Sequence, residues 1–495
     1  MQFFVDIILL LVYAIPVLYM CALLWRFWML YINQKAVNKV NKDTIMLEIK
    51  LPREIDKSPF AMEITSRAFL QGGGIGTWYH RQWLGNLPMQ FSLEIASLEG
   101  IVHFYIRTQK KFKSLIESNI YAQYPGVEIV EADDYTKLIR YHHLSKDVKL
   151  WGAAFVLGAK RKVGFDKKGK DYEMVADYIP LKTYIDYGFD KDPKEQYKND
   201  PITPLLEFMG SVGKGEYVWY QIIIQDEAAF NDKKFPKYYF DKVLGKRLGL
   251  ADLADMRKKF IRKYKKIKEG SLAFDQFGNP IQKTVRGSDD KVELQPVTYA
   301  DDRETQLKEV DLTPEEKDEI ELINRKLSKP LAKVILRLVY LARDDMKAFK
   351  PDRIQNVLNI LRPFHGVNSF IPKPSDGYDY PWQDFMKRRV PWRGEEMYDE
   401  YVQRDGFTPY ASKRDGLDKF EDVFFWGFPM RTRRLWRTFF ETVAHPFSYP
   451  QSDLVFTLNV EELATMYHFP GQTANIPTLP RIDSTKGVAP FNLPQ

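Results

Sequence analysis

Two glycine-rich segments are the first places to look for chemistry, because glycine loops can hold phosphate groups. Residues 210–215 (GSVGKG) contain a lysine, but no Ser or Thr follows it as in a phosphate-binding loop. This segment also joins an expected helix to a strand, whereas backbone amides are aimed at phosphate when a loop leads into a helix. Residues 72–76 (GGGIG) likewise follow an expected helix. We interpret both segments as connections and not as nucleotide sites.

The histidines and the cysteine do not form a recognisable site along the chain. None of the seven histidines is spaced from another, or from an acidic residue, as in a zinc motif. His142 and His143 are adjacent, so their side chains should point apart on a helix or strand. The single cysteine, Cys21, excludes a disulfide framework. The sequence therefore predicts no catalytic, metal-binding or cofactor-binding residue, no cofactor and no enzyme activity, although groups that meet only in space leave no such motif.

The clearest binding signal is a basic run at residues 257–268 (RKKFIRKYKKIK), whose apolar residues are spaced to share one helical face. Three interpretations remain open: contact with anionic lipid, contact with a nucleic-acid backbone, or a solvated helix whose apolar stripe packs on its own domain. The residues predicted to make the lipid or nucleic-acid contact are Arg257, Lys258, Lys259, Arg262, Lys263, Lys265, Lys266 and Lys268.

The N-terminal residues predict attachment to a membrane. Residues 7–25 (IILLLVYAIPVLYMCALLW) contain no charge, and a helix of about 20 apolar residues spans a bilayer. The first basic residue, Arg26, follows this run, and basic residues near a span stay on the cytoplasmic side. We therefore expect residues 1–33 to anchor the chain in the cytoplasmic (inner) membrane by a single span, with the N-terminus outside and the body in the cytoplasm.

The body of the chain contains two passages with a similar order of expected elements. In residues 44–140, strands and helices alternate as βαββαβ, which is the order of a ferredoxin-like unit. Glu99 and Gly100 are expected to form the turn between its alternating strands at 91–98 (FSLEIASL) and 101–108 (IVHFYIRT). In residues 148–375 the same order is expected with a first strand at 172–180 and a large basic insertion, residues 226–329, in place of a hairpin turn. The predicted fold class is α+β: one transmembrane helix, two tandem ferredoxin-like units and an extended Pro-rich tail.

The C-terminal part differs in composition from these two passages. Residues 376–468 are dense in aromatic side chains and Arg, which suit a partner surface or single-stranded nucleic acid, or fill a join between domains. A strand is expected at 454–458, and Asn459 is expected to cap a short helix. Residues 469–495 are predicted to be an extended tail whose removal after residue 471 spares the fold. The predicted anchors for a partner are Ile476, Leu479, Ile482, Phe491 and Leu493.

Several segments carry a resemblance to a known family: LPREIDKSPFAMEI, FSLEIASLEG and, above all, NVEELATMYHFPG and IPTLPR. They resemble the uncharacterised, membrane-anchored family of small-genome bacteria that is associated with type IV secretion. The closing stretch is similar to the segment that, in longer relatives, precedes a coupling-type (FtsK/HerA-like) ATPase. No Walker A loop follows it up to Gln495. The resemblance implies a non-catalytic scaffold or accessory subunit that docks a separate coupling-type ATPase at the membrane.

Two further hypotheses belong to other functional classes. The chain could be a membrane-tethered protein that binds nucleic acid through its basic insertion, in which case its affinity for DNA should depend strongly on salt. It could also be an enzyme with a site between the two α/β units. Self-association into a homo-oligomer is compatible with all three hypotheses.

Overall fold

The computed structural model divides the chain into two compact units, Met1–Gly158 with Pro180–Phe230 and Lys329–Gln495, and Ala159–Ile179 with Asn231–Ser328. The predicted basic contact, residues 257–268, lies outside the described residues. The structure describes scattered positions between 13 and 35 and residues 43–53, 55, 57–70, 83–84, 90–159, 162–165, 171–173, 179–189, 200–226, 282–286, 292–296, 322, 325–326, 328–375, 389–404, 454–471 and 477–482.

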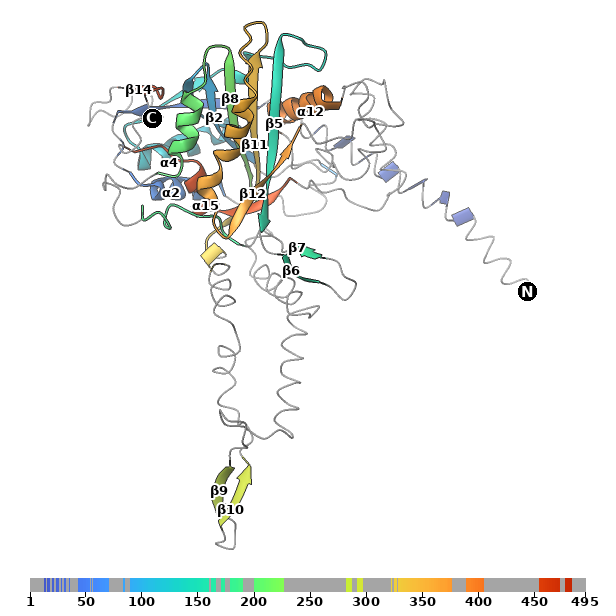
Figure 1. The fold of residues 1–495 in the computed structure, drawn as a ribbon, viewed down its shortest axis with the longest axis vertical. Helices are drawn as coiled ribbons and strands as arrows, with labels where there is room; N and C mark the ends of the chain where they lie inside the picture. The colour runs from blue at the N-terminus through green and yellow to red at the C-terminus, as the bar shows by residue number, and fades with distance from the viewer. Residues whose placement is uncertain are drawn as a thin grey trace. The chain divides into compact units, whose positions relative to one another are not determined.

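A ten-stranded sheet forms the centre of the first unit (Figure 1). Its order is β12-β5-β11-β8-β2-β3-β1-β14, with β13 also paired to β11 and β4 also paired to β1. The strands are β1 (Thr44–Pro52), β2 (Gln90–Leu98), β3 (Ile101–Gln109), β4 (Glu128–Ala132), β5 (Val148–Ala159), β8 (Glu216–Gln225), β11 (Leu331–Arg343), β12 (Asn368–Pro374), β13 (Phe456–Asn459) and β14 (Arg481–Ile482).

The two halves of this sheet meet at β2 and β8, which pair antiparallel from Gln90↔Gln225 to Leu98↔Tyr217. The central strand β8 is buried along almost its whole length, as its sequence EYVWYQIIIQ suggests for a strand that is covered on both faces. Both halves have the same strand order. If the four strands of a half are numbered along the chain, their order in the sheet is 4-1-3-2: β12-β5-β11-β8 in one half and β4-β1-β3-β2 in the other. The junction therefore joins the two halves into one continuous hydrogen-bonded sheet.

The predicted fold class, one transmembrane helix followed by two tandem ferredoxin-like units, is wrong. The strands of both passages form a single sheet, because β2 and β8, which are buried along almost their whole length, pair with each other instead of ending as exposed edges. The first strand of the second half is β5 and not residues 172–180. The predicted span, residues 7–25, lies mostly outside the described residues. Among the helices of the described part of the chain, none combines the length and apolar character needed to cross a membrane.

Helices lie on both faces of the sheet (Figure 1). On one face α15 packs against α2, and α2 packs against α4. On the other face lies α12, the longest described helix. The α-helices are α2 (Pro59–Phe69), α4 (Lys113–Gln123), α5 (Thr203–Gly210), α11 (Asp352–Asn359), α12 (Arg389–Gln403) and α15 (Val460–Met466), and the 3-10 helices are η1 (Lys110–Phe112), η2 (Tyr135–Lys137) and η6 (Arg362–Phe364).

Two local features predicted from the sequence are confirmed. Asn459 caps α15 in a capping box, in which its side chain accepts from the amide of Glu462 and the Glu462 carboxylate accepts from the amide of Asn459. The β2–β3 hairpin turns at Glu99 and Gly100, with φ angles of 55° and 93°. A Cβ atom at Gly100 would lie 2.6 Å from the carbonyl oxygen of Val212, so this position needs glycine for its conformation and for its close contact.

The second unit contains two described antiparallel pairs. One is formed by β6 (Lys162–Phe165) and β7 (Asp171–Glu173), with an irregular register. The other is formed by β9 (Gln282–Arg286) and β10 (Val292–Pro296).

Candidate functional site

The residues after α15 form a strap, which we define as residues 477–482, along one edge of the sheet. Of the five predicted partner anchors, the structure describes Leu479 and Ile482; the other three, Ile476, Phe491 and Leu493, lie outside the described residues. Leu479 is only 4% exposed, so it packs into the chain's own body and is not an exposed anchor. Ile482 is half-buried and belongs to β14.

Backbone hydrogen bonds tie both ends of the strap to the sheet. The amide of Val102 donates to the carbonyl oxygen of Thr478 over 3.2 Å. At the other end β14 runs parallel to β1, and the amide of Arg53 donates to the carbonyl oxygen of Ile482 over 3.2 Å. The guanidinium of Arg481 adds a bond of 3.1 Å to the carbonyl oxygen of Pro52. The strap therefore belongs to the folded body, and cutting the chain after residue 471 would remove one strand of the sheet.

The segment GSVGKG, which looked like a phosphate loop, has a structural role beside this strap. It runs from the last residue of α5 to the start of β8, as the sequence predicted. A Cβ atom at Gly210 would lie 2.0 Å from Oγ1 and 3.0 Å from Cβ of Thr478. Glycine at this position lets the strap pass directly over the end of the helix.

A cluster of buried charges lies between the sheet and the C-terminal end of α12. Arg404, the residue after the helix, donates from Nε to Glu94 Oε1 over 3.0 Å and from Nη2 to Glu94 Oε2 over 3.1 Å. The same Nη2 donates to Asp134 Oδ1 over 2.9 Å. Glu94 is fully buried and the Arg404 side chain is 1% exposed. This arrangement is a bidentate ion pair with a second carboxylate beside it, and it fixes the end of α12 on β2.

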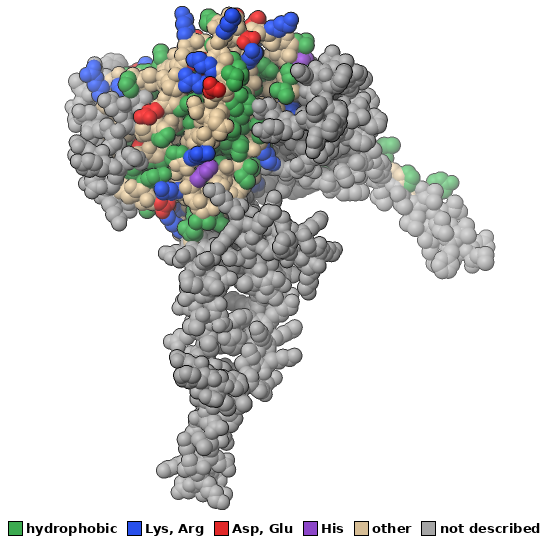
Figure 2. Space-filling model, in the orientation of Figure 1, with side chains coloured by type: hydrophobic (Ala, Val, Ile, Leu, Met, Phe, Trp, Pro, Cys, Tyr) green, Lys and Arg blue, Asp and Glu red, His purple; other side chains and the backbone are tan. Residues whose placement is uncertain are grey.

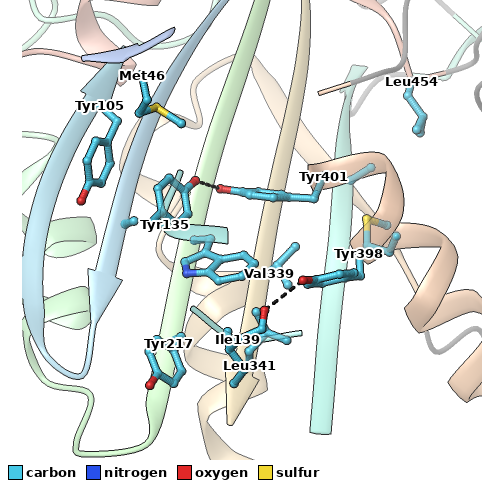
Figure 3. Packing of buried hydrophobic residues seen from close by; sticks show 14 residues of the cluster. Met46, Tyr105, Tyr135, Ile139, Tyr217, Val339, Leu341, Tyr398, Tyr401 and Leu454 are labelled. Atoms are coloured by element: carbon cyan, nitrogen blue, oxygen red, sulfur yellow. Dashed lines mark hydrogen bonds between the residues drawn. The ribbon is translucent and has the colours of Figure 1, made fainter. Parts of the chain in front are cut away.

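Neutral donors complete the hydrogen bonding of the Glu94 carboxylate. The Tyr135 hydroxyl donates to Glu94 Oε2 over 2.6 Å and also lies 2.7 Å from the hydroxyl of Tyr401 (Figure 3). Gln221, on the neighbouring strand β8, donates from Nε2 to Glu94 Oε1 over 3.2 Å. The buried carboxylate therefore accepts from several donors, as a buried charge must to be stable.

The protonation states of this cluster are held by its surroundings. Burial alone would raise the pKa of Glu94, but the charge and hydrogen bonds of Arg404 outweigh burial and keep that pKa below its usual value. Burial raises the pKa of Tyr135 and of Tyr401 well above the usual value for tyrosine. Groups with shifted pKa values often mark a catalytic site when they line a cleft. Here Glu94, Tyr135 and Tyr401 are buried, and their contacts hold α12 in place on the sheet.

Aromatic packing holds the rest of α12 on the same face of the sheet. Figure 3 shows Tyr398 and Tyr401 of α12 directed toward the aromatic and aliphatic side chains of the strands. The Tyr398 hydroxyl donates to the carbonyl oxygen of Ile139 over 2.9 Å, which links the helix to the segment that follows η2. Arg337 of β11 donates to the carbonyl oxygen of Glu400 over 3.3 Å.

Metal-ligand atoms come together at one place in the described part of the chain, near the N-terminal half of α12. His142, His143 and Glu395 each offer one ligand atom there, and these atoms all lie within 4.8 Å of one another. No local spacing in the sequence indicates this group, because the glutamate is 252 positions away from His143. The expectation that the two rings point apart is wrong: both residues lie in a turn between η2 and β5, where the alternation of a strand does not apply.

Comparisons of the chain with protein-family models, with curated proteins and with solved structures find no match. The resemblance to the family associated with type IV secretion therefore stays a prediction.

Proposed function

We propose that this protein is a non-catalytic docking subunit of a type IV secretion-like machine, and that the segment after its C-terminal strap holds a separate coupling-type ATPase. Attachment to a membrane is not part of this proposal. The proposal rests on the resemblance of the C-terminal motifs and on the contacts of the strap.

The position of the strap is the observation that carries the proposal. The motif IPTLPR, which resembles the segment before the ATPase in longer relatives, includes Thr478, Leu479 and Arg481. The body holds all three. The carbonyl oxygen of Thr478 accepts from the amide of Val102, the side chain of Leu479 is buried, and the guanidinium of Arg481 donates to the carbonyl oxygen of Pro52. A motif that is fixed on the folded body suits a docking function, because a preorganised segment loses less conformational freedom when it binds a partner.

The character of the buried charge cluster supports a binding function over catalysis. Glu94, Arg404 and Tyr135 satisfy one another in the interior, and burial separates them from any substrate. Such a network stabilises one arrangement of helix and sheet. A helix fixed on its sheet in this way suits a subunit that holds a partner in a defined orientation.

The described part of the face shown in Figure 2 suits a protein partner. On the face shown in Figure 2, Lys and Arg side chains gather at the top end, with acidic side chains among them and hydrophobic side chains between the charged ones. A surface that binds a nucleic-acid backbone is dominated by positive charge. Protein interfaces combine an apolar centre with a polar rim.

Point substitutions after the strap test the proposal. The full chain is co-expressed with the coupling-type ATPase, and their dissociation constant is measured by biolayer interferometry. We expect the double variant Phe491→Ala, Leu493→Ala to weaken binding by at least about tenfold, since truncating an interface anchor typically costs more than 1 kcal/mol. Val488→Ala is the matched control, because Val488 is an apolar residue of the same segment that is not a predicted anchor.

Two results would contradict the proposal. One is the absence of measurable binding between the unmodified chain and the ATPase. The other is equal loss of binding in the double variant and in the Val488→Ala control, because the predicted anchors would then have no special part in docking.

A further inference from the structure

We propose that His142, His143 and Glu395 form a binding site for one divalent transition-metal ion, and that zinc suits this set of ligands best. Two imidazoles and one carboxylate are ligands that zinc accepts, and a water molecule completes four-coordination in many such sites. The proposal is independent of the docking function.

The two histidine rings lie on the same side of their turn. Their centroids are 4.3 Å apart, and the ring planes are inclined by 31°. Between η2 and β5 the backbone has no helix or strand, so consecutive side chains can face in one direction. Adjacent histidines are therefore brought to one point, which neither a strand nor a helix would allow.

Glu395 faces both rings from α12. Its Oε2 atom forms a hydrogen bond with Nδ1 of His143 and also accepts a hydrogen bond from the backbone amide of His143 over 3.3 Å. Its Oε1 atom lies 3.6 Å from Nε2 of His142. Ligand atoms around a tetrahedral zinc ion with bonds of about 2.05 Å are about 3.3 Å apart. The ligand atoms here are within 4.8 Å of one another, so a small movement of the exposed His142 ring closes the set around an ion.

Metal binding at this site requires a defined tautomer of each ring. The backbone amide of Leu144 donates to Nδ1 of His142 over 3.2 Å, which places the proton of a neutral ring on Nε2. When an ion binds Nε2 of His142 and Nδ1 of His143, each of these nitrogens must give up its proton. In each ring the proton moves through solvent to the other nitrogen, which faces away from Glu395: Nδ1 in His142 and Nε2 in His143. Both rings stay neutral, and the bond from the Leu144 amide is given up. That bond is exposed, so water replaces it.

The surroundings of the site hold two of the three ligands in place. The side chains of His143 and Glu395 are 16% and 14% exposed, whereas that of His142 is 54% exposed. The ring of Trp392 packs edge-on against the ring of His143, with centroids 5.9 Å apart. Tyr141 donates to the carbonyl oxygen of Pro391 over 3.4 Å and so fixes the turn to the start of α12. A preformed pair with one exposed ligand gives an ion both a binding position and a path of entry.

Cobalt titration of the full chain tests the proposal. The protein carries no histidine tag, and Co²⁺ is the probe because its visible absorption reports coordination number and ligand type. We expect saturation at one Co²⁺ per chain with the intense bands of a four-coordinate site, and displacement of Co²⁺ by Zn²⁺. We expect Glu395→Gln and His143→Ala each to weaken Co²⁺ binding by at least about tenfold, because each removes a ligand.

His103→Ala is the matched control. His103 lies 2.7 Å from Glu48 in a half-buried histidine–glutamate pair that belongs to none of the described metal-ligand groups, so its removal should leave the Co²⁺ titration unchanged. Circular dichroism of each variant reports whether it is folded. The proposal is overturned if the unmodified chain shows no saturable four-coordinate Co²⁺ spectrum, a result that depends on no variant. It is also overturned if folded Glu395→Gln and His143→Ala proteins bind Co²⁺ as tightly as the unmodified chain.

Discussion

Replacing Arg404 with alanine should destabilise the protein strongly at neutral pH. The substitution removes two hydrogen bonds of 3.0 and 3.1 Å to Glu94 and leaves that carboxylate, which is fully buried, without a charged partner. Breaking a buried ion pair by removing one partner costs about 3–5 kcal/mol, mainly because the remaining charge is left uncompensated. Asp134, whose side chain is 23% exposed, can be solvated in part and adds less. We therefore expect a loss of about 3–5 kcal/mol at pH 7.

The pH dependence of this loss identifies its cause. In the unmodified protein the pKa of Glu94 is lowered, so Glu94 contributes stability above its unfolded pKa of about 4.3, and this contribution is lost as pH falls through the folded-state pKa. In the Arg404→Ala variant, the guanidinium no longer offsets the effect of burial on Glu94. The pKa of Glu94 should therefore rise above its value in the unfolded chain. The stability lost at pH 7 is then partly regained as pH falls through the raised pKa.

Urea denaturation at pH 7 and pH 5, followed by circular dichroism, measures both effects. Lys113→Ala is the control, because its ion pair with Glu131 is exposed and should contribute less than about 1 kcal/mol. The double variant Arg404→Met, Glu94→Gln should be more stable at pH 7 than Arg404→Ala, since it leaves no buried charge at position 94. A loss below about 1 kcal/mol for Arg404→Ala, or a loss of the same size at pH 5 and pH 7, would refute the reasoning.

Three further substitutions test the hairpin and the strap. Gly100→Ala should lower stability by at least about 2 kcal/mol in urea denaturation, because φ is 93° and the new Cβ atom would lie 2.6 Å from the carbonyl oxygen of Val212. Leu479→Ala should cost about 2–5 kcal/mol in the same assay, whereas an exposed anchor would cost almost nothing. Gly210→Ala favours the helix by about 1 kcal/mol, but the new methyl group collides with Thr478. Limited proteolysis should therefore cut the strap faster than in the unmodified chain. Unchanged cleavage would show that the strap tolerates the methyl group.

Local patterns in the sequence predicted many elements but not how the halves join. Some patterns depend only on residues that are close in the sequence, such as the alternation in FSLEIASL and IVHFYIRT and the turn at Glu99 and Gly100. These are found in the β2–β3 hairpin of the structure. The pairing of β2 with β8 joins residues more than one hundred positions apart. The sequence of a buried strand does not identify the strand with which it pairs, so this pairing could not be predicted. For this reason the sequence indicated two separate units where the structure has one sheet.

The candidate sites were less predictable for the same reason. Arg404 and Glu94 are 310 positions apart, and neither carries a local signature of an ion pair. The adjacency of His142 and His143 suggested rings that diverge, because the rule for strands and helices does not describe a turn. Leu479 looked like an exposed anchor because proline spacing predicts an extended chain but does not show whether that chain is covered.

The affinity of the coupling-type ATPase for two forms of this protein tests the docking proposal most directly. One form is the full chain, and the other ends after Ile482, so that it keeps the strap and the β14 pairing with β1. Both should unfold at the same urea concentration. We expect the full chain to bind the ATPase and the shortened form to lose at least about tenfold in affinity, because it lacks the same two predicted anchors as the Phe491→Ala, Leu493→Ala variant. Equal affinity of two equally stable forms would contradict it.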